Sequence, residues 1–433
     1  MDLSASFTPD RPDLRDLFRV FLRIGLLSFG GPAAQIALMH RELVEQRPWL
    51  SEDEFLRGLS FCMLLPGPEA MQLCTYTGWR LRGTFGGILA GLLFVLPGAA
   101  VIAALVWLYA AFGTVPGVQA AFAGIKAAVI IVVLQALWRL SKKALSKGSD
   151  WALAGLGFVG LFFLGLPFPV VVLGAGLFGL VKGQTPAAEP AEVTKGHGPQ
   201  SPLRIAAFWS ILWLTPLALL HFSGFGFLAD IGWFFAKLAV VTFGGAYAVL
   251  AYMSQTVVEQ HGWVTAGQMI DALGLAETTP GPLILVTQFI AMLAGLTTGG
   301  MPVFLAAGAV ALWATFVPCF LWIFTAAPYV ERLSQHPRLG SALKAITAAV
   351  TGVILNLSVW FLLHVLFRDL PQTQVGPLSF VVPDWSSLDA EALLLTAVAA
   401  GAAIALRGRL LWLLALMVVA GLAVAAAPDL LLP

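Results

Sequence analysis

Apolar residues are gathered along this chain in long runs with few or no charges, such as residues 87–112 and 127–137. A bilayer core is about 30 Å thick, and roughly 20 apolar residues in a helix cross it. Ten to thirteen segments of this kind can be marked along the sequence. The pattern therefore predicts an all-α polytopic membrane protein.

The apolar pattern and its interruptions occur twice. Residues 28–68 align without a gap with residues 242–282, which lie 214 positions further along. Fourteen of these 41 positions are identical: Phe29/Phe243, Gly30/Gly244, Gly31/Gly245, Ala34/Ala248, Ala37/Ala251, Met39/Met253, Val44/Val258, Glu45/Glu259, Gln46/Gln260, Trp49/Trp263, Leu59/Leu273, Pro66/Pro280, Gly67/Gly281 and Pro68/Pro282. After a four-residue shift, Lys126 in "GIKAA" matches Lys344 in "ALKAI". We interpret the chain as an internal duplication of residues 14–182 and 224–427.

Between these halves, residues 183–202 are rich in Pro, Gly and Ala and poor in large apolar residues. This composition is typical of a flexible linker. Residues 203–222 then form one further apolar segment, which we expect to cross the membrane and to invert the second half.

The distribution of Lys and Arg predicts the orientation of the two halves. Arg41, Arg47 and Arg57 lie in one loop of the first half, whereas the matching loop, residues 254–271, has no Lys or Arg. Further cationic loops are residues 139–147, 332–338 and 407–409. The same motif is therefore expected on opposite sides of the membrane, with a cytoplasmic N-terminus and two inverted repeats.

Two interpretations of the segments 14–40 and 55–80 are open. As broken hairpins they return to the side on which they begin, and every cationic loop is then cytoplasmic. As full spans they keep the inversion but place three arginines outside. We prefer the hairpins, followed by spans at 83–112 and 115–140 and a short two-helix hairpin at 151–182.

Composition narrows the class of function. The chain is 59% hydrophobic and 11% charged, with a net charge of +1, so no nucleic-acid partner is expected. The N-terminus lacks the basic start and apolar core of a signal peptide. The cysteines, Cys62, Cys74 and Cys319, have no metal-type spacing, the histidines form no paired motif, and no ATP-binding loop is present. We expect no metal, no cofactor and no catalytic residue.

Helix-breaking residues recur inside the apolar segments, as Gly-Gly and Pro-Gly-Pro in each half. Irregular backbone is tolerated within a membrane only where it is buried in protein or lines a wet cavity. A helix that begins at such a break offers free N–H groups and a partial positive charge to an anion. A single pair could simply permit a kink or close packing. Breaks duplicated at fixed spacing indicate a transporter of inverted repeats, with its substrate between them.

Four cations in or beside the apolar segments are candidates to bind an anion. Lys126 lies about ten residues into a span after Pro116, and Lys344 is its counterpart. Arg23 precedes the first Gly-Gly, and Lys237 occupies the equivalent place in the second half. An ionisable residue within a membrane is a functional hypothesis by default. The alternative is that these side chains extend to the interface.

Other polar residues adjoin the breaks. Glu69 follows the first Pro-Gly-Pro, and Glu277 precedes the second by three residues. These carboxyls could carry protons or could serve as fixed partners for Arg23 or a lysine. Gln72 and Thr279 are neutral hydrogen-bonding candidates.

The paired motifs resemble the signature of the chromate ion transporter family in its long two-domain form. The resemblance rests on Gly30, Gly31, Trp49 and Pro66-Gly67-Pro68, with their counterparts Gly244, Gly245, Trp263 and Pro280-Gly281-Pro282. It implies oppositely oriented halves and efflux of chromate across the bacterial inner membrane, driven by the membrane potential or a proton gradient. Pro32 follows the first Gly-Gly and Ala246 the second, so the two breaks differ.

We therefore expect a multi-pass secondary transporter that confers chromate resistance and binds the dianion at the breaks. Sulfate or another oxyanion is the alternative cargo, and a passive anion channel is the alternative mechanism. A membrane reductase has no haem, flavin or cysteine pair to support it. Chromate and membrane lipid are the expected partners, and the sequence leaves open whether two copies form a homodimer.

Overall fold

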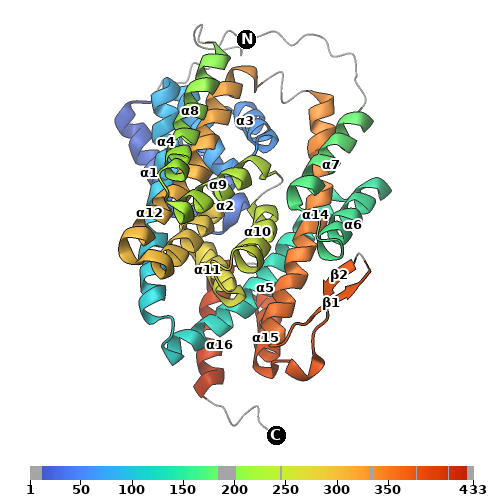
Figure 1. Ribbon diagram of the computed structural model, residues 1–433. Helices are drawn as coiled ribbons and strands as arrows, with labels where there is room; N and C mark the ends of the chain where they lie inside the picture. Colours follow the sequence, from blue (N-terminus) through green and yellow to red (C-terminus); the bar gives the residue numbers. More distant parts are fainter. Residues whose placement is uncertain are drawn as a thin grey trace.

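The computed structural model describes residues 12–183, 201–243, 246–330, 336–376, 378–407 and 409–426. These residues are almost entirely helical (Figure 1). Within these described ranges, five helices are long and apolar enough to cross a membrane: Glu69–Phe112, Pro116–Ala144, Pro202–Phe222, Leu283–Tyr329 and Pro337–Leu366. The predicted all-α polytopic membrane class is confirmed. Most of the predicted linker, and both Gly244 and Gly245, lie outside the described residues.

The first half begins with short helices separated by breaks. They are α1 (Leu14–Leu27), α2 (Gly31–His40), the π-helical turn η1 (Arg41–Glu45) and α3 (Glu52–Leu64), and α4 (Glu69–Phe112) follows. Asp13 caps α1, and Ser51 forms a capping box with Glu54 at the start of α3. Helix α1 ends before Gly30-Gly31 and α3 ends before Pro66-Gly67-Pro68, whereas α2 continues into η1.

The second half repeats this order. It contains α9 (Gly226–Val241), α10 (Ala246–Gln255), the π-helical turn η2 (Thr256–Gln260), α11 (Ala266–Thr278), the 3-10 turn η3 (Leu283–Leu285) and α12 (Val286–Ala326). Thr265 caps α11 with Gln268 just as Ser51 caps α3. The bounds of α3 and α11 differ by the same 214 residues as the sequence motifs. The π-helical turns follow α2 and α10 alike and were not predicted.

Both α4 and α12 are helical hairpins rather than single rods. Non-helical angles interrupt α4 at Arg82–Gly83 and α12 at Gly299–Gly300. The turn of the α4 hairpin lies beside the start of α1, because Arg82 Nε donates to Pro12 O at 2.6 Å. Arg80 also bonds Glu54, and His40 lies 2.6 Å from Glu52. Segments 14–40 and 55–80 therefore enter and leave on one side of the molecule, as the hairpin interpretation requires.

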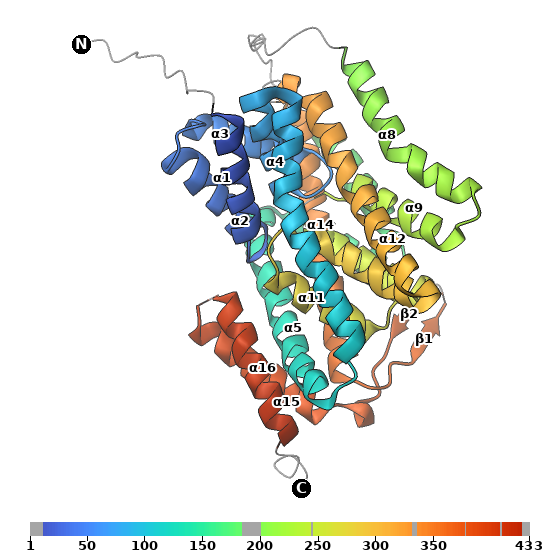
Figure 2. The same cartoon turned by 90° about the vertical axis from the view of Figure 1, so that its left-hand side faces the viewer.

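The remaining helices of each half pack against the other half. The first-half hairpin of α6 (Gly148–Phe162) and α7 (Phe168–Lys182) packs on second-half α14 (Pro337–Leu366). The hairpin of α15 (Ala390–Ala405) and α16 (Leu410–Ala426) packs on first-half α5 (Pro116–Ala144). Figures 1 and 2 show α15 and α16 at the end of the molecule opposite α3. Each half therefore completes the core of the other.

Two further elements lie outside this plan. Helix α8 (Pro202–Phe222) runs along one edge of the molecule and packs on α9 and α12 (Figure 2). A small antiparallel hairpin of β1 (Gln372–Val375) and β2 (Leu378–Val381) follows α14 and was not predicted. The 3-10 turns η4 (Ala327–Tyr329) and η5 (Trp385–Ser387) complete the order.

Glycines allow the exchanged helices to approach closely. A Cβ added at Gly421 would lie 2.1 Å from Ala120 O, and one at Gly124 would lie 1.7 Å from Met417 O. Contact of this kind between small residues is a principal source of helix association in membranes. The α5–α16 interface is therefore defined by backbone contact.

We predict that Gly421→Ala lowers the thermal unfolding midpoint of the detergent-solubilised protein by several degrees, because overpacking costs about 1–3 kcal/mol. The matched control is Gly401→Ala on α15, where an added Cβ meets nothing within 4 Å. Equal midpoints for the two variants would contradict the close packing of α5 on α16.

Candidate functional site

The breaks of the two halves meet and exchange backbone hydrogen bonds. The Gly67 N–H donates to Thr242 O at 2.9 Å, and the Gly281 N–H donates to Ser28 O at 3.0 Å. Each bond joins a Pro-Gly-Pro of one half to the residue that lies two positions before the Gly-Gly of the other. The two bonds are equivalent under the 214-residue repeat. An unpaired backbone group in an apolar interior costs several kcal/mol, so these bonds stabilise the meeting of the breaks.

The residues that accept these bonds are themselves buried. The Ser28 hydroxyl donates to Ile24 O at 2.6 Å, and the Thr242 hydroxyl donates to Leu238 O at 2.5 Å. Each hydroxyl thus bonds within its own half, and the backbone carbonyl of the same residue accepts the bond from the other half.

Glycine is required at the start of α2 because both Gly30 and Gly31 have positive φ, +83° and +79°. A Cβ at Gly31 would meet nothing within 4 Å, so this position faces open space. Pro32 occupies the first turn of α2, where a missing N–H removes no helical bond. The break therefore delivers a helix N-terminus to a free surface.

The two Pro-Gly-Pro segments differ in burial. Pro280, Gly281 and Pro282 are buried, and a Cβ at Gly98 would lie 2.2 Å from Pro280 O. Pro66 and Pro68 are half-buried, and Gln72 Nε2 donates to Pro66 O at 2.6 Å. The second break is thus the more tightly enclosed.

A cavity of about 370 Å³ adjoins the N-terminus of α2. Its walls come from α2, α3, the start of α4, α5, α10, α11, α14, α15 and α16, and its polar lining includes Glu69, Gln135, Arg139, Lys143, Tyr247, Glu277 and Arg409. Arg139 and Lys143 lie one helical turn apart on α5, and Arg409 lies just before α16. None of these three cations has an ion-pair partner among the residues that the structure describes.

The carboxyls at this cavity are differently placed. Glu277 is 4% exposed and accepts a hydrogen bond of 2.6 Å from the Tyr247 hydroxyl. Glu69 is half-buried and lies within electrostatic reach of Lys143. The cavity therefore combines a helix N-terminus, three cations and two carboxyls.

Of the residues predicted to bind substrate, Gly30 and Gly31 line this cavity, as do the proton-coupling candidates Glu69 and Glu277. Gly67, Pro68 and Pro282 line a much smaller pocket with Gln35. The Thr279 hydroxyl donates to Ala276 O at 3.1 Å, at the C-terminal end of α11.

None of the four predicted cations lines the cavity, and three of them have carboxylate partners. Arg23 Nε lies 3.5 Å from Glu42 Oε1, Lys126 Nζ lies 3.5 Å from Asp271 Oδ2, and Lys344 Nζ lies 3.8 Å from Asp150 Oδ2. Lys237 is exposed on α9.

The three cations of the cavity were missing from the sequence candidates because they belong to runs interpreted as cytoplasmic loops. Arg139 and Lys143 stand four residues apart inside a helix, and that spacing was the available signal. Arg409 reaches the cavity only because α15 and α16 pack on α5, which no local pattern indicates. Within the described ranges, no three His, Cys, Asp or Glu side chains are grouped to hold a metal.

Comparison with known proteins identifies relatives of this chain. The sequence profile of the chromate transporter family matches residues 15–180 and 229–425. A probable chromate transport protein of Synechococcus elongatus is 31% identical over 85% of this chain and 89% of its own length. Chromate transport proteins of Cupriavidus metallidurans and Pseudomonas aeruginosa are 33% and 34% identical, over 79% and 82% of this chain and 80% and 82% of their own lengths. No solved structure matches the chain.

The junction of the breaks leads to a stability prediction at Gln35, whose Nε2 donates to Gly281 O at 2.7 Å. We expect Gln35→Leu to lower the free energy of unfolding by about 1–3 kcal/mol, because it removes a donor from a buried carbonyl. Urea or thermal unfolding of the purified protein measures the change, with Ile36→Leu as the neighbouring control. If Gln35→Leu is as stable as the control, this bond does not support the junction.

Proposed function

We propose, because this chain belongs to the chromate transporter family, that it exports chromate from the cytoplasm across the bacterial inner membrane and so confers chromate resistance. The family is one of transporters and not of enzymes. We place the substrate in the cavity at the N-terminus of α2. The process would be secondary transport, driven by the membrane potential or a proton gradient.

The observation that carries this assignment is the set of unpaired cations beside a helix N-terminus. Arg139, Lys143 and Arg409 can each donate to an oxyanion, and the dipole of α2 favours negative charge at Gly31. A dianion without compensating charge is expensive to bury. Lys126 and Lys344 offer less to an anion, because each is paired with its own carboxylate. Arg23 lies outside the cavity and shares the carboxylate of Glu42 with Arg47.

The charges of the cavity also suggest how protons take part. Three cations and two ionised carboxylates leave a net charge of +1, whereas chromate carries −2. Protonation of Glu277 or Glu69 raises the cavity to +2 and balances the dianion. Chromate and a proton are therefore expected to bind together, and the inside-negative membrane potential then drives out the remaining negative charge.

The orientation of the halves follows from the same proposal. With the arginine-rich loop before α3 in the cytoplasm, the matching loop before α11 faces the periplasm. The reciprocal bonds at Gly67 and Gly281 are what a pseudo-twofold relation between residues 14–182 and 224–427 would produce. Helix α8 then serves as the span that inverts the second half.

Sulfate shares the charge and shape of chromate and is the rival cargo, while a passive channel is the rival mechanism. Flux into vesicles that contain the purified protein separates them. With the membrane potential held at zero, chromate movement against its concentration gradient when a proton gradient is imposed supports secondary transport, and flux that never runs uphill supports a channel. Saturable sulfate flux without chromate flux would overturn the proposed cargo.

We predict that Arg139→Ala and Lys143→Ala each weaken chromate binding at least about tenfold, since a charge-assisted hydrogen bond contributes roughly 1.5–3 kcal/mol. Calorimetry on the purified protein measures the dissociation constant, and survival on chromate medium measures export. The control is Lys142→Ala, because Lys142 lies over the Trp138 ring and outside the cavity. Unchanged binding in both cavity variants places the anion elsewhere.

A second prediction concerns protons at Glu277. Chromate binding to the parent protein should weaken as pH rises, because a deprotonated Glu277 leaves the cavity one positive charge short. Glu277→Gln keeps that site neutral, so its binding should depend less on pH. Parallel titrations of the two proteins cancel the protonation of chromate itself. Identical pH profiles would remove Glu277 from the coupling.

A further inference from the structure

We propose that the ion pair of Lys126 and Asp271, joined by Tyr109, is a latch that holds the periplasmic side of the transport path closed. This inference rests on the proposed function and on the orientation given above. It assigns Lys126 a gating role in transport in place of direct contact with the anion.

The latch joins three helices at one carboxylate. Asp271 on α11 is 4% exposed. Its Oδ2 lies 3.5 Å from Lys126 Nζ on α5 and accepts a hydrogen bond of 2.8 Å from the Tyr109 hydroxyl on α4. The charge of Lys126 is therefore already balanced, and the pair as a whole presents no net charge to an anion.

The helices beneath the latch are in direct contact. A Cβ at Gly274 on α11 would lie 2.3 Å from Ile125 Cγ2 and 3.3 Å from Val129 Cγ2 on α5. Val129 is 2% exposed. No room for a substrate exists between α11 and α5 at this level.

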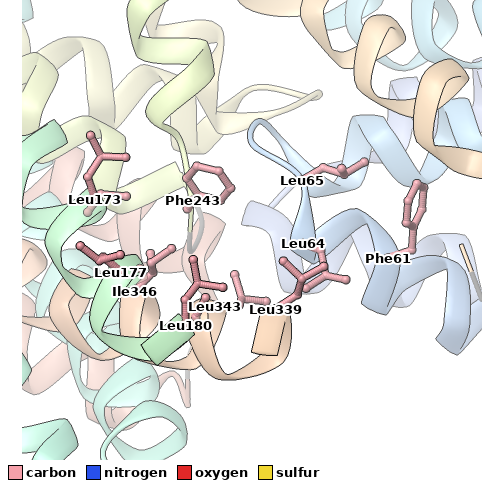
Figure 3. Close-up of a pocket in the computed structure, with 13 residues that line it drawn as sticks. Phe61, Leu64, Leu65, Leu173, Leu177, Leu180, Phe243, Leu339, Leu343 and Ile346 are labelled. Carbon is pink, nitrogen blue, oxygen red and sulfur yellow. The ribbon is translucent and has the colours of Figure 1, made fainter. Parts of the chain in front are cut away.

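The equivalent interface of the other half is open. Helix α3 corresponds to α11, and α14 corresponds to α5. Helices α3 and α14 touch over a smaller area than their counterparts do, and together with α7 they line an apolar cavity of about 650 Å³. Figure 3 shows Phe61 and Leu65 across this cavity from Leu177 and Ile346.

The second pair of equivalent interfaces differs in the same sense. Helix α10 packs on α14, where Trp360 Nε1 donates to Glu259 Oε1 of the following turn at 2.8 Å. Its counterpart α2 is separated from α5 by the 370 Å³ cavity of the candidate site. The second-half elements α10 and α11 thus pack more closely on the α5–α14 pair than α2 and α3 do, and a cavity of about 420 Å³ remains between α10, η2 and the C-terminal part of α14.

Inverted repeats that adopt different conformations at one time are the structural basis of alternating access. We infer that this structure is open toward the cytoplasm and closed toward the periplasm. In the opposite state, α2 and α3 would dock and α10 and α11 would separate. That separation requires the Lys126–Asp271 pair to break.

The opposite state has no latch of this kind. The counterpart of Asp271 is Arg57, and the counterpart of Lys126 is Lys344. Two cations cannot form an ion pair, and Lys344 is held by Asp150 on α6. The latch therefore biases the resting protein toward the inward-open state.

Charge reversal tests the latch against the alternative that Lys126 binds chromate. We expect Lys126→Ala and Asp271→Asn to keep the chromate dissociation constant within about twofold but to reduce uphill flux at least about tenfold, as for breaking a coupled pair. The double variant Lys126→Asp/Asp271→Lys should recover much of the flux, because it re-forms the pair. If Lys126 contacts the anion, binding is lost in Lys126→Ala and the reversed pair stays inactive, which would overturn the latch.

A cysteine reporter tests the conformational change without a transport assay. In a chain with Cys62, Cys74 and Cys319 replaced by alanine, Val129→Cys should react slowly with a maleimide, because Val129 lies under α11. Adding Asp271→Asn should speed its labelling at least about tenfold by releasing α11. The matched control is Thr347→Cys on α14, the counterpart of Val129, whose labelling should not rise.

The outcomes are separable from those of the proposed function. Equal labelling of Val129→Cys with and without Asp271→Asn overturns the latch, whatever the cargo. Faster labelling in a protein that binds no chromate supports the latch and overturns the proposed cargo.

Discussion

Broken helices inside an apolar protein create backbone groups that water cannot reach, and the whole arrangement depends on how these groups are satisfied. Each half supplies the partner for the other, through Gly67 to Thr242 and Gly281 to Ser28. A helix break that depends on a second break cannot exist in one half alone. The contact between the halves is therefore a condition of the fold at its centre, and motion must take place around it.

This condition explains where open space occurs. The junction itself is filled by proline rings, glutamine amides and the close approach of Gly98. The larger cavities lie beside the junction, along the helices that leave it. Positive charge is placed there by α5 and by the turn before α16, which come from different halves of the chain. The anion site is thus assembled from elements that neither repeat contains by itself.

Much of the fold could be predicted from the sequence because the duplicated helix-breaking motifs are local. Pro-Gly-Pro follows the end of a helix in each half, and its repetition with Gly-Gly at fixed spacing predicted the breaks and the order of the segments. The candidate site was harder to predict. Lys126 looks like an unpaired charge in the sequence because Asp271 lies far along the chain, and Arg409 looks like a surface residue until α16 is packed on α5. Partners brought together only by tertiary contact have no periodicity to detect.

The exchange of hairpins has a consequence for the synthesis of the protein. Helix α5 leaves the ribosome early, yet the face around Gly124 is covered by α16, which is among the last segments made. During most of translation this face must be exposed to lipid or to a chaperone. Helix α14 differs, because α6 and α7 are already present when it emerges. The two halves have related sequences, but their helices meet their final neighbours in a different order during synthesis. A chain truncated before α16 would leave α5 of the first half without the helix that covers it.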